Sequence, residues 1–304
     1  EKIFSKFFPK TPSLSEGFSR NMNFSARQLY YNLPPAWRFA ARRLWFLPLD
    51  VWENLTGKRG ELTPPRGMIF TGGGDFRQSG EKLVGYLREF GGLQPHHHVL
   101  DVGSGIGRAA IPLTRFLNEK GGYEGFDVVE RGVAWCREKI SSQFPNFQFR
   151  YVPLDNDLYR AGGGKAAAFR FPYEAGRFDL AIVNSVFTHM LPEEVDNYLG
   201  EIHRVLKPGG VCYATFFLFD KNAPAGFRKE FDFPFNYGNY RLMDERVKSA
   251  NVAFEENFLR RDLLEKHGFR LRQLFYGSWR GLPKEACKDF QDLVILEKAA
   301  TENS

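Results

Sequence analysis

The 304-residue chain has little cysteine and no long apolar run. Its three cysteines, Cys136, Cys212 and Cys287, lie far apart in the sequence and form no C-x-x-C pair. We therefore expect free thiols in a reducing compartment, and no metal site. The longest apolar run, around residues 211–219, has only the length of a strand, and the first residues contain no apolar signal-peptide core. The sequence thus predicts a cytoplasmic protein without a membrane-spanning segment.

Positive charge is not in excess outside the first 70 residues. Residues 1–70 contain eleven Lys and Arg against five Asp and Glu, whereas the rest contains 31 of each. An enzyme that acts on nucleic acid carries its basic surface around the active site, so this distribution predicts no nucleic-acid partner. Aromatic residues are abundant at 16%, which indicates aromatic-lined pockets or interfaces in addition to core.

Residues 98–108 are the most informative stretch, and they read H-V-L-D-V-G-S-G-I-G-R. An apolar burst typical of a buried parallel strand leads into three glycines at alternate positions, and an apolar segment with helical spacing follows. Such a turn lets the backbone approach a ligand, and the helix start offers free N–H groups. Arg108 stands where a dinucleotide-binding G-x-G-x-x-G turn would need its third glycine, which disfavours an NAD-dependent dehydrogenase.

A regular alternation of strands and helices follows, which predicts a parallel sheet. We expect strands over 123–126, 147–152 and 178–183 and helices over 79–90, 130–142 and 192–205. The second strand ends at Asp127, where a carboxylate can hold a ribose diol through two hydrogen bonds. Residues 184–190 follow the fourth strand, at the edge where open α/β sheets bind ligands. A helix over 254–267 and strands over 269–279 and 290–297 complete the domain.

Residues 69–298 resemble bacterial class I S-adenosylmethionine (SAM) methyltransferases of small molecules. The resemblance rests on the D-x-G-x-G-x-G turn, the acid at the end of the second strand and the R-V-L-K-P-G-G stretch at 204–210. A narrower subgroup is marked by Trp135-Cys136, residues 185–192, the Y-G-S-W stretch at 276–279 and Gln291-Asp292. The resemblance implies one α/β domain with a seven-stranded Rossmann-like sheet of order 3-2-1-4-5-7-6.

The same resemblance implies that SAM is the cofactor. SAM carries an ammonium and a sulfonium group, and an acid near the glycine turn suits both charges. The residues expected to bind it are Asp101, Gly103, Ser104, Gly105, Gly107, Arg108, Asp127, Val128, Asp155, Asn184 and Ser185. An acid at the place of Asp155 pairs with the adenine amino group in this family, although the loop is shorter here. Residues 184–187 lack both prolines of the Asn-Pro-Pro-aromatic motif of amino-methylating DNA enzymes.

The predicted reaction is transfer of the SAM methyl group to a small-molecule acceptor, preferably at a hydroxyl oxygen. Methylation of nitrogen or of a lipid headgroup, and a SAM-binding module without turnover, are the alternatives. His189, six residues past Val183, is the expected general base, because a similar His has this role in phosphoethanolamine methyltransferases, paired with a Tyr from the N-terminal segment. Tyr30 and Tyr31 are available for that pairing. The other interpretation is that His189 only orders the turn into the next helix.

We expect residues 1–68 to form a basic, aromatic N-terminal arm, and residues 299–304 a short tail. Within the arm, residues 33–52 predict a helix that mixes Trp, Phe and Arg. It would either cap the mouth of the site or lie on anionic lipid as a peripheral membrane contact. We expect a linker over 53–75. The oligomeric state is not predicted.

Two further segments are expected on the substrate side. Residues 219–245 are an insert after the fifth strand in which aromatic side chains are mixed with charges, and from it we assign Phe235, Tyr237 and Tyr240 to the acceptor. A surface excursion packed by its own aromatic residues is the alternative. Residues 71–77 are a glycine-rich segment before a helix, which is either a cover for the cofactor or a flexible linker. From it we assign Phe76 and Arg77 to the substrate.

Overall fold

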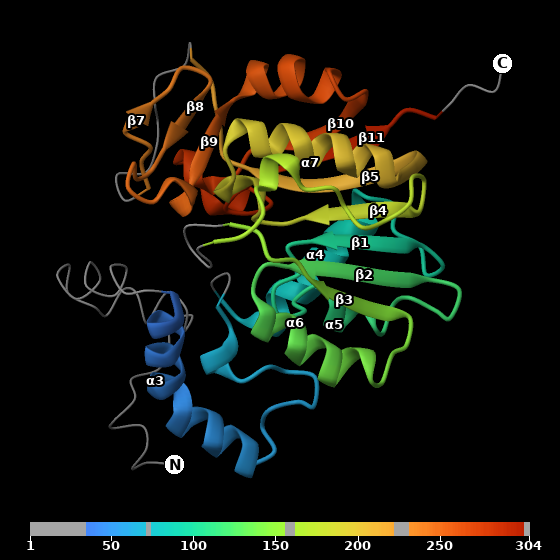
Figure 1. Ribbon diagram of the computed structural model, residues 1–304, viewed down its shortest axis with the longest axis vertical. Helices are drawn as coiled ribbons and strands as arrows, with labels where there is room; N and C mark the ends of the chain where they lie inside the picture. Colours follow the sequence, from blue (N-terminus) through green and yellow to red (C-terminus); the bar gives the residue numbers. More distant parts are fainter. Residues whose placement is uncertain (1–34, 71–73, 156–161, 222–230, 301–304) are drawn as a thin grey trace.

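The computed structural model describes residues 35–70, 74–155, 162–221 and 231–300 (Figure 1). Within them, a seven-stranded sheet has the order β3-β2-β1-β4-β5-β11-β10. Its strands are β1 (His98–Val102), β2 (Gly122–Asp127), β3 (Phe147–Tyr151), β4 (Phe178–Val183), β5 (Leu206–Phe216), β10 (Phe269–Phe275) and β11 (Asp292–Lys298). The strand β11 runs antiparallel to both of its neighbours, β5 and β10, and the other pairs of this sheet are parallel. Because β10 and β11 are the sixth and seventh strands of this sheet along the chain, the predicted order is confirmed.

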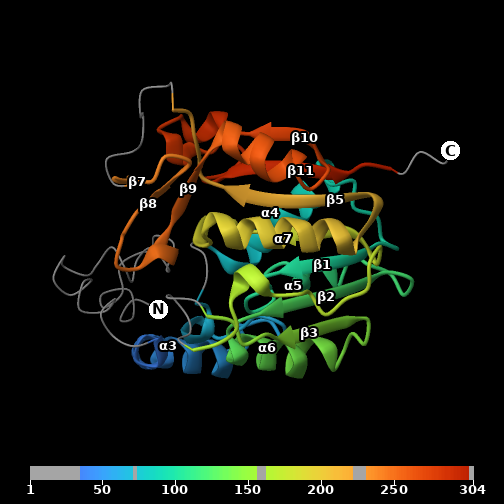
Figure 2. The same cartoon turned by 45° about the horizontal axis from the view of Figure 1, so that its top comes forward.

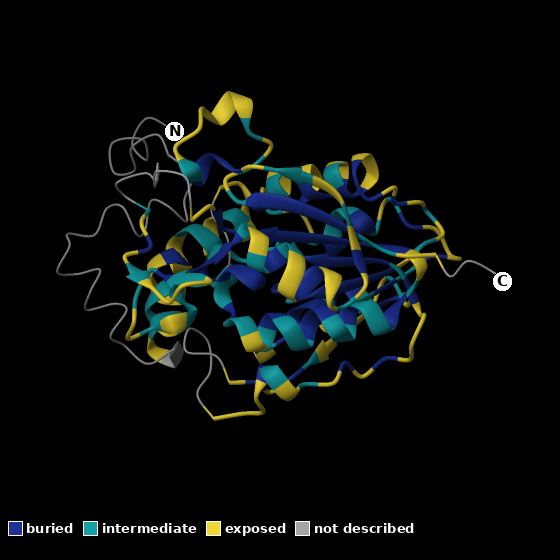
Figure 3. Ribbon diagram, turned by 90° about the horizontal axis from the view of Figure 1, so that it is seen from above, coloured by how far each residue is buried: buried dark blue, intermediate teal, exposed yellow. Residues whose placement is uncertain are grey.

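Helices cover both faces of the sheet (Figure 2). They are α4 (Phe76–Glu89), α5 (Ala110–Leu113), α6 (Glu130–Cys136) and α7 (Pro192–Val205), with a π-helical turn at Arg137–Ser141. The helix α3 (Pro35–Leu55) lies to one side of the sheet. Successive residues of a strand point to opposite faces, so Val99 packs with α4, α5 and α6 while Leu100 packs with α7. Figure 3 shows the strands as the most buried part of the molecule.

The first turn of α7 shows why this helix begins where the sequence predicts. Pro192 suits a first turn because it has no N–H to satisfy. The Glu194 carboxylate accepts a hydrogen bond from the Leu191 backbone N–H at 2.7 Å and complements the helix dipole. The helix predicted after the glycine turn is shorter, because α5 covers only four residues. It contains Pro112, which cannot donate a backbone hydrogen bond.

The segment after β5 forms a second, four-stranded sheet of order β6-β9-β8-β7. Its strands are β6 (Leu218–Phe219), β7 (Phe235–Asn236), β8 (Tyr240–Leu242) and β9 (Val252–Glu255). The prediction that a helix begins at Phe254 is wrong, since Phe254 is buried in β9. Its N–H donates to the Phe217 carbonyl at 2.7 Å. The Glu255 carboxylate accepts from the Phe258 N–H at 2.7 Å, which places the helix start after the strand; its main part is the π-helix Phe258–Glu265.

The chain before β1 is ordered by α3, whose last residue is Leu55, so the predicted linker begins later than residue 53. The Asp50 carboxylate of α3 accepts from the backbone N–H groups of Arg66 and Gly67 at 2.6 and 3.0 Å, which fixes the returning chain. Among the residues that the structure describes, no helix is long and apolar enough to cross a membrane. Tyr30 and Tyr31, the expected partners of His189, lie outside the described ranges.

Candidate functional site

A cleft of about 700 Å³ opens at the carboxyl ends of β1, β2 and β4. This volume is within the range of small-molecule and cofactor sites. Every residue predicted to bind the cofactor lines the cleft except Gly107, and His189 lines it as well. The lining set from the prediction is Asp101, Gly103, Ser104, Gly105, Arg108, Asp127, Val128, Asp155, Asn184 and Ser185.

The glycine turn after β1 needs backbone conformations that favour glycine, because Gly103, Gly105 and Gly107 have φ of 75°, 57° and 80°. A Cβ on Gly103 would lie 2.5 Å from Cγ2 of Val186. The turn is held to β2 by the N–H groups of Gly103 and Ser104, which both donate to the Phe126 carbonyl at 2.9 and 3.0 Å.

Gly107 differs from the other two glycines of the turn, because it does not line the cleft. A Cβ there would lie 2.8 Å from Cδ1 of Ile140 and 3.1 Å from Sγ of Cys136. Both residues belong to the helical segment that begins with α6. Gly107 therefore lets the turn pack on that helix, and it does not line the cleft.

Asp127 ends β2 with its carboxylate held by main-chain donors. The Gly105 N–H donates to Oδ2 at 2.8 Å and the Val129 N–H to Oδ1 at 2.7 Å. Burial raises the pKa of Asp127 to about 6, although these hydrogen bonds oppose the shift. A carboxylate oxygen can accept more than one hydrogen bond, so both oxygens retain capacity for the two hydroxyls of a ribose.

Asp101 lies beside the turn and is also buried. The Tyr123 hydroxyl donates to its Oδ2 at 2.5 Å. Burial raises the pKa of Asp101 to about 7, and the nearby charge of Asp127 adds to the rise against this hydrogen bond. A cation bound next to Asp101 would favour its ionised form, so the site fits the charge of an ammonium or sulfonium group.

Ser104 supplies a separate test of fit. Its Oγ is buried and has no hydrogen-bond partner among the described residues, although it lies in the lining of the cleft. Buried hydroxyl groups are normally hydrogen-bonded, so this atom calls for a polar group of a ligand. The Asp155 carboxylate, in contrast, already has a partner within the protein, because its Oδ1 accepts a hydrogen bond from the Gly162 N–H at 2.5 Å.

His189 lies after β4 on the 3-10 turn Phe187–His189. Its Nδ1 is 2.8 Å from the carbonyl oxygen of Ser249, in the segment between β8 and β9. A carbonyl can only accept, so Nδ1 carries the proton of the neutral ring and Nε2 is the basic atom. Burial lowers the pKa of His189, which favours the neutral ring, and backbone hydrogen bonds with Ser249 and Ala250 oppose this shift. The contact orders the lip of the cleft against the segment between β8 and β9, and it does not involve Nε2.

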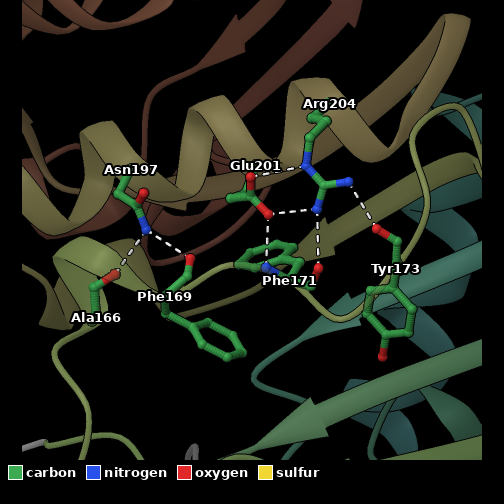
Figure 4. A network of polar contacts seen from close by, with 7 residues as sticks. All are labelled: Ala166, Phe169, Phe171, Tyr173, Asn197, Glu201 and Arg204. Carbon is green, nitrogen blue, oxygen red and sulfur yellow. Dashed lines mark hydrogen bonds and ion pairs between the residues drawn. The ribbon is translucent and has the colours of Figure 1, made fainter.

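The network in Figure 4 fixes residues 166–173, between β3 and β4, and Ala166 of this segment lines the cleft. Nδ2 of Asn197 donates to the carbonyls of Ala166 and Phe169, both at 2.9 Å. Arg204 forms an ion pair with Glu201 at 2.6 Å and donates to two further loop carbonyls, those of Phe171 at 3.0 Å and Tyr173 at 2.8 Å. Thus α7 holds this segment through its main chain.

The five residues assigned to the substrate do not line the cleft. Phe76 is buried beneath the Arg108 guanidinium, whose central carbon is 4.9 Å from the ring centre. Arg77 is exposed and pairs with Glu81 at 3.1 Å. The rings of Tyr237 and Tyr240 stack at 5.0 Å within the second sheet, and Phe235 packs against the core. The geometry therefore gives these assignments no support.

One wall of the cleft was missed by the sequence prediction. It joins α4 to the segment before β11 and consists of Lys82, Tyr86, Lys284, Asp289, Phe290 and Gln291. The ammonium of Lys82 is 3.1 Å from the Asp289 carboxylate. The Ser185 hydroxyl donates to Oε1 of Gln291 at 2.9 Å, with Ser185 itself at φ 58°. The one signal in the sequence was the subgroup pair Gln291-Asp292.

Two of the subgroup stretches, residues 276–279 and Gln291-Asp292, meet at this corner. The buried Asp292 carboxylate accepts from the Gly277 N–H at 2.6 Å and from Nε1 of Trp279 at 2.8 Å. It also accepts from the Leu218 N–H at 2.7 Å, where the insert begins. Burial raises the pKa of Asp292 to about 7 against these hydrogen bonds. The predicted strand 269–279 therefore ends early, at Phe275, because the Y-G-S-W stretch turns to bind Asp292.

Comparison with known proteins places this geometry in a class. Residues 100–214 match the family described as "Methyltransferase domain". The chain is 31% identical over 122 residues to the arsenite methyltransferase of Mus musculus, a match that covers 38% of this chain and 29% of that enzyme. It is 26% identical over 134 residues to the highly reducing polyketide synthase easB of Emericella nidulans, covering 42% of this chain and 5% of the synthase. The chain thus spans less than a third of either relative's length.

A solved structure extends the likeness to the fold. The PH0226 protein of Pyrococcus horikoshii OT3 superposes with a TM-score of 0.50 at 19% identity, covering 73% of this chain and 91% of that one. The family match over residues 100–214, together with the order of the seven strands, identifies a class I methyltransferase domain within the chain, and this class uses SAM. The predicted family, fold class and cofactor are confirmed. Its bacterial origin stays a prediction.

Proposed function

We propose that the chain transfers the methyl group of SAM to a hydroxyl oxygen of a small molecule bound beside His189. The observation that supports this proposal most directly is the state of the His189 ring. Its Nδ1 is committed to the Ser249 carbonyl, so the basic Nε2 belongs to a residue that lines the cleft. A nitrogen acceptor that arrives unprotonated needs no such base, which favours oxygen.

The cofactor half of the cleft has groups for each polar part of SAM. Asp127 would accept the ribose hydroxyls, and Asp101 would face the ammonium end. The unpartnered Oγ of Ser104 would bond a polar atom of the same ligand. When bound, SAM supplies an electrophilic methyl group. Transfer of that methyl group would break its bond to the sulfonium sulfur and leave S-adenosylhomocysteine. The protein's part would be to hold the acceptor in line, with His189 Nε2 placed to take the proton of the acceptor hydroxyl.

The acceptor named for the mouse relative, arsenite, finds no matching groups in this cleft. A soft acceptor of that kind is bound well by thiols. Cys136 and Cys212 are buried, Cys287 is partly buried, and none of the three lines the cleft. The polar wall with Lys82 and Gln291 suits a hydroxylated organic molecule better.

Release of S-adenosylhomocysteine, measured across a panel of hydroxylated acceptors, tests the proposal. With an active acceptor, His189→Ala should lose about 10²- to 10⁴-fold in turnover while cofactor affinity and melting temperature stay near wild type. His203→Ala is the matched control, because His203 lies on α7 outside the cleft lining. A stable His189→Ala protein with full turnover would refute the base. Tight SAM binding without release for any acceptor would favour a binding module.

A further inference from the structure

The outward face of α3 reverses the usual arrangement of a surface helix, because large apolar side chains point to solvent. The exposed members are Trp37, Leu44, Trp45, Leu47, Val51, Trp52 and Leu55. Leu44, Trp45 and Leu55 are 70%, 68% and 80% exposed. Separations of three, four, seven and eight residues bring side chains to the same side of a helix. These residues are spaced in that way, so they form one stripe along α3. Contiguous exposed apolar surface of this kind marks an interaction site.

The opposite face of α3 is anchored to the rest of the protein. Phe46 is buried, and the Arg131 guanidinium at the start of α6 lies 4.3 Å from the ring centre of Phe39. Phe39 meets the ring of Phe70 edge to face at 5.7 Å, and Phe70 lines the cleft. Figures 1 and 2 both show α3 on the β3 side of the molecule. The exposed stripe is therefore the outer face of a docked helix.

The composition around the stripe favours a lipid surface over a protein partner. Three of the chain's five tryptophans lie on it, and tryptophan prefers the boundary between headgroups and acyl chains. Arg43 is exposed on the same helix, and the Lys58 ammonium lies 4.3 Å from the Trp52 ring centre. Long basic side chains can place their charge among anionic headgroups while their stems cover apolar surface. Residues 1–70 hold the whole net charge of +6.

We propose that α3 docks the protein peripherally on an anionic lipid bilayer, with its apolar stripe in the headgroup region. The helix would lie in the plane of the surface, in keeping with its lack of the apolar length needed to span. Through Phe39 and Phe70, the docked helix is in contact with the wall of the cleft. The proposal is independent of methyl transfer, because it concerns a surface outside the cleft.

Intrinsic fluorescence provides a direct measurement on the full-length chain. Trp135 and Trp279 are buried, so a change on adding vesicles reports the three tryptophans of the stripe. With vesicles of phosphatidylcholine and about one-third phosphatidylglycerol, we expect a blue shift and co-sedimentation. Both should weaken with pure phosphatidylcholine and at high salt, because the basic residues lose their counter-charges or are screened.

Leu44→Glu and Leu282→Glu form a matched pair, since both leucines are exposed and both changes add one negative charge. Leu282 lies outside α3. We expect Leu44→Glu to weaken vesicle binding by about tenfold or more and Leu282→Glu to leave it nearly unchanged. Leu55→Glu, at the last residue of the helix, should repeat the loss and guards against a folding defect at one position.

Three outcomes would overturn the proposal. The first is that the intact protein binds no anionic vesicles at low salt. The second is that Leu44→Glu and Leu282→Glu lose binding equally, which would make net charge the cause. The third is a dimer that forms without lipid, dissociates in Leu44→Glu and shows no blue shift with vesicles, which would make the stripe a contact between two copies.

Discussion

Cofactor affinity should depend on pH through Asp101. Its pKa of about 7 means that the carboxyl group is mostly protonated at pH 6 in the ligand-free protein. A ligand ammonium requires the ionised form, so binding must release a proton. With this pKa, the ionised fraction rises from about 9% at pH 6 to about 76% at pH 7.5, which corresponds to about eightfold tighter binding, or about 1 kcal/mol. Asp127, with its pKa of about 6, adds about twofold over the same interval.

Calorimetry with S-adenosylhomocysteine, which keeps the ammonium group, measures this dependence. Titrations in buffers of different ionisation enthalpy should show about 1.4 protons released per ligand at pH 6, about 0.9 from Asp101 and about 0.5 from Asp127. The interval ends at pH 7.5 so that the ligand's amino group stays largely protonated. Asp101→Asn is the control. In this variant the eightfold change in affinity between pH 6 and 7.5 should disappear, and the twofold change that belongs to Asp127 should remain.

The stability of the ligand-free protein should change in the opposite direction. A carboxyl group with a raised folded-state pKa stabilises the fold fully below its unfolded value, and that contribution is lost as pH rises through the folded value. Asp101 and Asp292, both at about 7, therefore lower stability as pH rises from about 4 to about 7. Affinity that is flat between pH 6 and 7.5, with no proton release, would refute the assigned role of Asp101.

Three other substitutions have distinct expected outcomes. Gly107→Ala should destabilise the protein by about 1–3 kcal/mol in denaturant titrations, because its Cβ meets Ile140 at positive φ, while the folded fraction keeps cofactor affinity; weakened ligand binding at unchanged stability would contradict this. Asp127→Ala should cost about 2–4 kcal/mol of cofactor affinity by calorimetry, and wild-type affinity would remove Asp127 from the ribose role. Arg204→Ala should lower the melting temperature and expose the 166–173 loop to proteolysis, whereas resistance equal to wild type would show that the loop does not depend on Arg204.

The sheet was predictable because its strands carry local signals. The central strand β4 is a short apolar run, and α7 begins at a proline followed by two glutamates. Phe254 shows the limit of such local signals. An apolar residue next to the start of a helix can equally belong to a buried strand, so the sequence alone does not assign it. Only the pairing with β8 and the Glu255 cap decide between them, and both depend on tertiary contacts.

The site was predictable only in part, for a related reason. A glycine spacing identifies the turn, but it cannot say which glycine meets the ligand and which, like Gly107, meets a helix. Lys82 and Asp289 face each other across 207 positions of sequence, a distance that no local pattern connects. The aromatic residues of the insert were assigned to the acceptor from composition. Composition does not distinguish a residue that packs in a small sheet, such as Tyr240, from one that faces a cleft.

The absence of a side chain at Gly103 has a consequence for the order in which the cofactor and the acceptor bind. Because Gly103 has no side chain, Val186 can pack directly against the glycine turn. Val186 precedes His189 by three residues, so the turn expected to hold the cofactor is in contact with the segment that carries His189. A ligand that settles on the turn also restrains the segment that carries the imidazole. We therefore expect the cofactor to enter first and the acceptor second, and the spent cofactor to leave last. In steady-state kinetics, S-adenosylhomocysteine would then compete with SAM and inhibit noncompetitively against the acceptor.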